Sequence, residues 1–231
     1  MLEFDWGCGN HVVMTWKLNN DADNSTANGV CLSKSYLWAK RCLTMGRAPR
    51  TREEFDRELF GKGSLEPTEF LAALNNGVGV GPTSFATQAL HAWGQRKFAK
   101  DRDKQQEDPL KYAMIDPVKN FNRRIAKGHG LIANQPLDSM DDFVTGTPHS
   151  RWLDCALGNG DGAYVFTVVQ DGGNGYHHTM AIYISSQPAL FDSEQGQFSC
   201  KREDFRDDVL EYMNRCYPNL GACDLWKPRF V

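Results

Sequence analysis

The hydrophobic pattern of the chain changes its period at about residue 150, and no other feature restricts the possible folds as strongly. Before this point, apolar residues recur at helical spacing in segments that begin near Val30, Thr51, Pro67, Pro82 and Asp116. After it come short runs rich in β-branched and aromatic residues, "GAYVFTVVQ" (162–170), "HTMAIYIS" (178–185), "ALFD" (189–192) and "GQFSC" (196–200). Helices followed by an antiparallel sheet predict an α+β fold.

Local signals mark the ends of several expected helices. Thr51 and Glu54 form a capping-box pattern at the start of one of them. Pro82 suits the first turn of a long helix, and Gly128 is placed to end a later one. The charged stretch "KDRDKQQED" (100–108) is expected to be a solvated loop after the long helix.

We expect one domain over residues 1–231, with a helical part at about 28–130 and a sheet part at about 150–231. Three further elements are predicted: a short strand from "HVVMTWK" (11–17), an amphipathic helix within 202–217 and a closing strand within 223–231.

Composition and charge argue against several classes of protein. The 231 residues are 41% hydrophobic and 24% charged, with a formal net charge of −3, which is ordinary for a globular chain. A slightly acidic chain is not expected to take nucleic acid or an anionic membrane as its main partner. No apolar run approaches the roughly 20 residues that cross a bilayer, and the first residues lack the basic head and apolar block of a signal peptide.

The seven cysteines are scattered along the chain and include no C-x-x-C pair. An odd, unpaired set without a signal peptide favours reduced thiols over a disulfide framework. A zinc site is not expected either, because structural zinc is usually held by closely spaced pairs of ligands. The cysteines are therefore interpreted as free thiols.

Cys31 is the cysteine whose surroundings favour reactivity. It follows Gly29-Val30 and stands where a helical pattern begins. The unpaired N–H groups and the dipole at a helix N-terminus stabilise a thiolate, which is the nucleophilic form of cysteine. Taken alone, this position favours a buried cysteine that acts as a small hydrophobe, which is the usual role of a cysteine in an intracellular protein.

A base and an orienting acid follow much later in the chain. His177 and His178 open one expected strand, and Asp192 ends the next. Side chains alternate along a strand, so the two histidines face opposite sides, and alternation alone leaves both open as the base. A thiol at a helix start, a histidine on a strand and an acid on the next strand supply a nucleophile, a base and an orienting group, in the chain order of papain-type enzymes.

Three short boxes resemble the YopT/AvrPphB group of bacterial effector cysteine proteases, which have a papain-like fold. The "GVC" box of their nucleophile is matched by Gly29-Val30-Cys31, and the strand H-x-x-A-[VIA]-Y of their base is matched by "HTMAIY" from His178. The box of their acid, similar to F-D-P-N-x-G-x-F, is matched by "FDSEQGQF" (191–198), with Ser193-Glu194 in place of Pro-Asn. The resemblance selects His178 rather than His177 as the base.

This resemblance implies a helical lobe packed against an antiparallel sheet lobe, with the active site in the cleft between them. Cys31 is then the nucleophile, His178 the base and Asp192 the residue that orients the imidazole. The backbone N–H of Cys31 and the side chain of Asn28 are expected to form the oxyanion hole, with Asn24 as the alternative to Asn28. The chemistry requires no metal or organic cofactor.

The implied activity is that of a thiol hydrolase, a cysteine endopeptidase that cleaves a host protein after signal-peptide-independent secretion into the host cytoplasm. Small GTPases and kinases are the known targets in the group, and the chain is expected to act as a monomer. A glutamine or asparagine deamidase and an acyltransferase toxin pass through the same thioester, so both remain open. A non-enzymatic interaction module and a zinc-binding or redox-sensing protein are the rivals from other classes.

Overall fold

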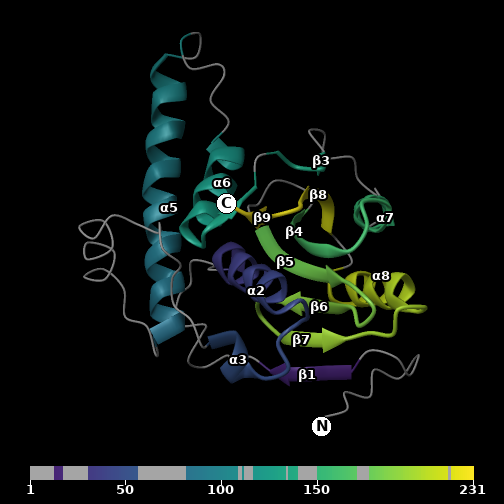
Figure 1. The fold of residues 1–231 in the computed structure, drawn as a ribbon. Helices are drawn as coiled ribbons and strands as arrows, with labels where there is room; N and C mark the ends of the chain where they lie inside the picture. The colour runs from purple at the N-terminus through teal and green to yellow at the C-terminus, as the bar shows by residue number, and fades with distance from the viewer. Residues whose placement is uncertain are drawn as a thin grey trace.

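The computed structural model describes residues 13–17, 31–56, 82–108, 111, 117–133, 135–139, 150–170, 177–217 and 220–231. The described helices are α2 (Cys31–Met45), α3 (Arg52–Asp56), α5 (Pro82–Glu107), α6 (Pro117–Gly128), α7 (Ser150–Gly158) and α8 (Phe205–Cys216). The described strands are β1 (Val13–Lys17), β2 (Leu131–Ile132), β3 (Asp138–Ser139), β4 (Gly162–Gln170), β5 (His177–Ile184), β6 (Ala189–Asp192), β7 (Gly196–Ser199), β8 (Leu220–Trp226) and β9 (Arg229–Phe230). The α+β prediction is confirmed (Figure 1).

One antiparallel sheet of seven strands organises the molecule, in the order β1-β7-β6-β5-β4-β8-β3. Its centre is the long hairpin of β4 and β5, in which Gly162 lies opposite Ile184 and Val169 lies opposite His177. The strand predicted within 11–17 joins one edge as β1, beside β7. Strands β2 and β9 form a separate two-stranded sheet.

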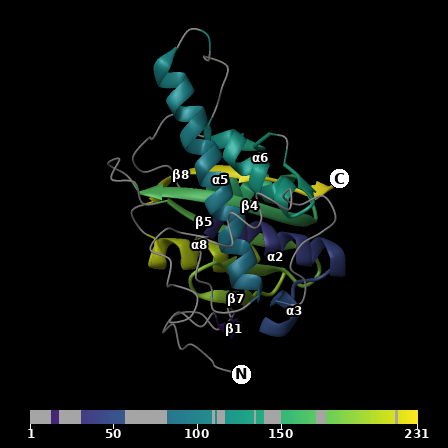
Figure 2. The same ribbon diagram turned by 90° about the vertical axis from the view of Figure 1, so that its left-hand side faces the viewer.

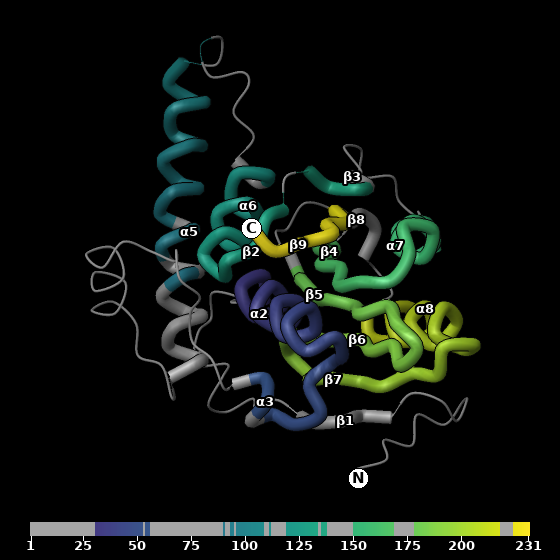
Figure 3. Tube along the Cα trace, in the orientation of Figure 1, coloured from purple at the N-terminus to yellow at the C-terminus, as the bar shows by residue number. Residues whose placement is uncertain are grey.

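The two faces of this sheet carry two separate cores. On β5, Ala181 and Tyr183 belong to the core under α2, whereas Met180 and Ile182 belong to the core under α7 and α8. The Cα trace shows α2 on one side of β5 and β6 and α8 on the other (Figure 3). Because side chains alternate along a strand, His178 shares the α8 face with Met180.

Helix α2 is the central helix of the fold. All its residues from Leu32 to Cys42 are buried, because the sheet covers one side and α5 and α6 lie on the outer side (Figures 1 and 2). Glycines let α5 and α6 approach closely. A Cβ at Gly94 would lie 2.6 Å from the Ile125 side chain, and one at Gly128 would lie 2.3 Å from the Leu90 side chain.

The structure corrects one expectation about helix ends and confirms another. Residues 100–107 are not a loop, because α5 continues to Glu107. Lys, Arg, Gln and Glu are good helix formers, and the first residue that cannot continue the helix is Pro109. Helix α6 does end at Gly128, yet the backbone reverses at Gly130, which has a φ of 74° and donates its N–H to the carbonyl of Lys127.

Several other expectations have mixed outcomes. Helix α7 was not predicted, since only three of its side chains, Trp152, Leu153 and Ala156, are buried. The helix expected from Pro67 lies outside the described residues. None of the described helices is long and apolar enough to cross a membrane.

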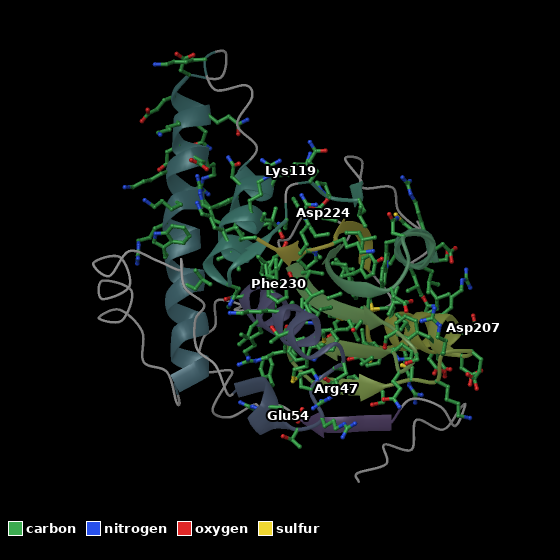
Figure 4. The ribbon with its side chains drawn as sticks, viewed as in Figure 1. Arg47, Glu54, Lys119, Asp207, Asp224 and Phe230 are labelled. Atoms are coloured by element: carbon green, nitrogen blue, oxygen red, sulfur yellow. The ribbon has the colours of Figure 1, made fainter. Side chains whose placement is uncertain are left out.

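The capping pattern at Thr51 is present at the start of α3. The hydroxyl of Thr51 accepts the N–H of Glu54 at 3.3 Å, and the Glu54 carboxylate accepts the N–H of Arg50 at 2.7 Å. The guanidinium of Arg47, just after α2, points at Glu54 (Figure 4) and bonds both carboxylate oxygens, at 2.8 and 2.9 Å. Hydrogen bonds from Arg47 and Arg50 lower the pKa of Glu54 to about 2. These contacts fix α3 against the C-terminal end of α2.

A buried histidine ties α6 to the N-terminal half of α2. His129 is 1% exposed, and its Nε2 lies 2.9 Å from the hydroxyl of Ser33. Burial, and then the positive charge of Lys40, lower the pKa of His129 to about 3. The folded protein therefore holds His129 neutral at every pH at which it is expected to work.

Acid is expected to destabilise the protein through His129. Its pKa is depressed on folding, so its contribution is complete above the unfolded value of 6.5 and is lost as the pH falls from there towards 3. At about pH 5 the loss amounts to roughly 2 kcal/mol of unfolding free energy. His129→Gln keeps a hydrogen-bonding group but cannot gain the proton. Urea unfolding of both proteins at about pH 7 and 5 is expected to show a smaller pH effect in the variant, and equal pH effects would contradict this assignment.

Candidate active site

The thiol of Cys31 lies at the first residue of α2, where the sequence places it. The residue is partly exposed, while Leu32 and the next ten residues are buried. Thr179 of β5 hydrogen-bonds the thiol through its side chain and its backbone, and His178 hydrogen-bonds it through the imidazole. The N-terminus of α2 is thus held against the start of β5.

His178 and Asp192 come together because they lie on neighbouring antiparallel strands. Met180 of β5 pairs with Asp192 of β6, so His178, two residues earlier on the same face, is a diagonal neighbour of Asp192. The Nε2 of His178 lies 3.0 Å from Oδ1 of Asp192, and the two side chains are 1% and 0% exposed. Since Nε2 is engaged with the carboxylate, Nδ1 is the nitrogen left to exchange a proton with the thiol.

Five donors surround the carboxylate of Asp192. Its Oδ1 accepts hydrogen bonds from His178 and from the backbone N–H groups of Glu194 and Gln195, at 2.7 and 3.3 Å. Its Oδ2 accepts from the hydroxyls of Tyr212 and Tyr217, at 2.6 and 2.5 Å. Burial alone would raise the pKa of Asp192, but the hydrogen bond and charge of His178, followed by the hydroxyls of Tyr212 and Tyr217, lower it to about 2.

The same contacts shift the pKa values of the base and the thiol. Burial would lower the pKa of His178, but its bonds to Asp192 and Cys31 raise it to about 10. Burial would also raise the pKa of Cys31, yet the hydrogen bond and charge of His178, followed by the contacts from Thr179, bring it below its ordinary value. The arrangement favours a thiolate beside an imidazolium at neutral pH.

Two serine hydroxyls bond the backbone carbonyl of Thr179, the residue that follows His178 and contacts the thiol. The carbonyl oxygen of Thr179 accepts the hydroxyl of Ser35, one turn into α2, at 3.0 Å. It also accepts the hydroxyl of Ser193, in the turn after β6, at 3.1 Å. One carbonyl therefore joins the helix, the strand of His178 and the turn of Asp192.

Glu194 stands at the rim of the site, where the resemblance has a different residue. Its Oε1 lies 3.6 Å from Nδ1 of His178, and its side chain is 46% exposed. A second carboxylate beside the imidazole adds to the negative potential that favours the imidazolium.

The structure thus brings Cys31, His178 and Asp192 together, as the sequence predicts. The expected oxyanion groups Asn28 and Asn24, and the side chain of His177, lie outside the described residues. The spacing of residues gave no signal for Thr179, whose contacts with the thiol arise only when α2 packs on β5. It gave none for Tyr212 or Tyr217 either, because their contacts with Asp192 arise only when α8 packs on the sheet.

A cavity elsewhere on the molecule lies apart from the three candidate residues. It has a volume of about 210 Å³, lies near the C-terminal end of α2 and is lined by residues that include Arg47, Pro49, Arg50, Pro188, Gln197 and Ser199. In the part of the chain that the structure describes, no group of three or more His, Cys, Asp or Glu side chains is placed to hold a metal ion.

Comparison with known proteins gives one informative match. No family model matches the chain, and no curated protein does either. Among solved structures, the crystal structure of the Pseudomonas avirulence protein AvrPphB matches with a TM-score of 0.53 over 90% of this chain and 94% of that chain. The identity of 13% is low enough that the likeness concerns the fold alone. The chain therefore has the papain-like α+β fold of AvrPphB, one of the two proteins that name the group its three sequence boxes resemble.

Proposed function

We propose that the chain is a cysteine endopeptidase whose catalytic residues are Cys31, His178 and Asp192. The observation that carries the proposal is that one buried imidazole hydrogen-bonds both the thiol and the carboxylate. A thiolate stabilised in this way, at the start of a helix, is the nucleophile that acyl transfer requires.

The proposed reaction begins when the Cys31 thiolate attacks the carbonyl carbon of a peptide bond. The carbonyl electron pair moves to the oxygen, and the resulting oxyanion is stabilised by the backbone N–H of Cys31 and the amide of Asn28. His178 gives its Nδ1 proton to the nitrogen of the leaving amine, the C–N bond breaks and a thioester remains. His178 then takes a proton from water, which attacks the thioester and releases the acid together with the thiolate. Asp192 holds the imidazole through Nε2 in every step.

The proposed substrate is a host protein, and the proposed place of action is the host cytoplasm. The fold of an avirulence protein and the three sequence boxes support a secreted bacterial effector that acts in the host. By the same resemblance, small GTPases and kinases are the first targets to test.

Incubation of the protein with lysates of plant and animal cells is the direct test, with Cys31→Ala as the matched control. New protein N-termini are expected in one or a few proteins, only with the unchanged chain. Deamidated Gln or Asn without new N-termini would identify a deamidase that uses the same thioester. Acylated amines would identify an acyltransferase. No modification in any lysate would contradict an enzymatic role and leave an interaction module.

A further inference from the structure

Two tyrosines from one end of α8 converge on the acid of the candidate site. Tyr212 lies in the last turn and a half of α8, and Tyr217 follows the helix directly. Both hydroxyls donate to Oδ2 of Asp192, at 2.6 and 2.5 Å. The five-residue spacing brings both rings to the same carboxylate because the chain leaves the helix at Tyr217, whose N–H still bonds the carbonyl of Met213 at 2.8 Å.

The two oxygens of Asp192 are thereby given different partners. The tyrosines occupy Oδ2, so Oδ1 is the oxygen that faces His178 at 3.0 Å. A buried carboxylate with donors on both oxygens has one rotamer and one orientation, whereas a carboxylate with donors on one oxygen alone is free to turn. Burial raises the pKa of Tyr212, so its hydroxyl keeps its proton and remains a donor.

Tyr217 also limits the motion of the base. Its ring stacks on the His178 imidazole, with centroids 5.0 Å apart and planes inclined by 24°. The ring of Tyr217 covers one face of the imidazole. At its edge, the Nε2 atom of the imidazole is bonded to Asp192 of β6. His178 is consequently 1% exposed, although its partner Cys31 is partly open to solvent.

We propose that Tyr212 and Tyr217 are positioning residues that keep Asp192 ionised and turned towards His178, so that the thiolate and imidazolium persist into acidic solution. The role in turnover rests on the proposed function, whereas the effect on the thiol does not. Neither tyrosine touches the reacting atoms, and both act through Asp192.

Among the described residues, the titratable and charged groups around this cluster come from α2, β5, the turn after β6 and α8. His178 and Thr179 come from β5, Cys31 from α2, Glu194 from the turn after β6, and Cys216 with Arg215 from α8. Removal of a hydroxyl donor leaves the charges of these groups unchanged and makes the ionised form of Asp192 less favourable. Asp192 then takes up a proton at a higher pH, and the imidazolium and thiolate lose the charge that supports them.

The test compares Tyr212→Phe, Tyr217→Phe and the double variant, each of which keeps the ring and loses the hydroxyl. Tyr164→Phe is the matched control, because the Tyr164 hydroxyl bonds the carbonyl of Gly160, away from Asp192. The rate at which iodoacetamide alkylates Cys31 is measured against pH, together with turnover of the substrate found in lysate.

As the pH falls, the alkylation rate of Cys31 drops, and the pH at which it reaches half of its plateau is the acid midpoint. In the double variant, this acid midpoint is expected to rise by about one pH unit, which makes alkylation roughly tenfold slower at a pH well below the midpoint. Each single variant is expected to show a smaller rise, and Tyr164→Phe none. Turnover is expected to fall through kcat, with KM nearly unchanged, and the loss is expected to be larger at acid pH.

The proposal is overturned if the pH at which the alkylation rate of Cys31 falls to half is unchanged in all three variants. It is also overturned if Tyr164→Phe shifts that pH by the same amount. A uniform loss of alkylation at every pH would indicate a purely structural role and would also overturn it. If the pH dependence of Cys31 alkylation shifts as expected but the protein turns over no substrate, the positioning role is supported and the endopeptidase is refuted. The failure of one proposal is thus distinguishable from the failure of the other.

Discussion

Cys31→Ala is expected to abolish turnover, with a loss of about 10⁴-fold or more in kcat. His178→Ala is expected to cause a loss of the same order, because the thiol and the imidazole make and break bonds as one unit. The double variant should therefore be no worse than either single one. Initial rates on the substrate identified in lysate measure these losses, and circular dichroism checks that the variants fold.

Asp192 should be tested with Asn rather than Ala. Ala would leave the hydroxyls of Tyr212 and Tyr217 without an acceptor in a fully buried site, so lost stability would obscure lost activity. Asp192→Asn keeps the shape and is expected to leave a small fraction of the activity, since Asp192 orients the imidazole and supports its positive charge but exchanges no proton. Activity that survives Cys31→Ala but is lost in Cys155→Ala would refute the assignment of the nucleophile.

Cys31 is expected to be the thiol that iodoacetamide modifies first, roughly tenfold to a hundredfold faster than an ordinary cysteine at about pH 6. At that pH an unperturbed thiol is almost entirely protonated, whereas Cys31 pairs with an imidazolium. Burial raises the pKa of Cys42, Cys200 and Cys216, so these thiols are expected to react slowly.

Mass spectrometry after brief treatment of the folded protein identifies the modified residue. His178→Gln is the informative comparison, because it removes the imidazolium and leaves Cys31 at the helix N-terminus. At about pH 6, Cys31 in this variant is expected to react little faster than an ordinary cysteine. Its alkylation rate is expected to recover as the pH rises towards the pKa of an ordinary thiol. First modification of Cys155 or Cys216, with Cys31 untouched, would contradict the prediction.

Elements with a strong local period were predictable almost to the residue. Strand β4 spans 162–170 and β6 spans 189–192, as their β-branched and aromatic runs predict. Helix α2 begins at Cys31, where Gly29-Val30 precedes the helical pattern. Expectations failed where the local signal was weak or ambiguous. The charged residues 100–107 suit both a loop and a solvated helix, and the nine residues of α7 are too few to show a clear period.

The candidate site also has a part that the sequence predicted and a part that it did not. The sequence by itself determined the candidate residues, because Cys31, His178 and Asp192 stand at the ends of elements whose order is a local property of the chain. Strand alternation left His177 and His178 both open, and the three sequence boxes chose His178. Only the tertiary structure decided what surrounds these groups, since α8 must pack on the sheet before Tyr212 and Tyr217 reach Asp192. Burial, the shared hydrogen bonds and the pKa shifts of the cluster depend on contacts between residues far apart in sequence, and no local pattern records such contacts.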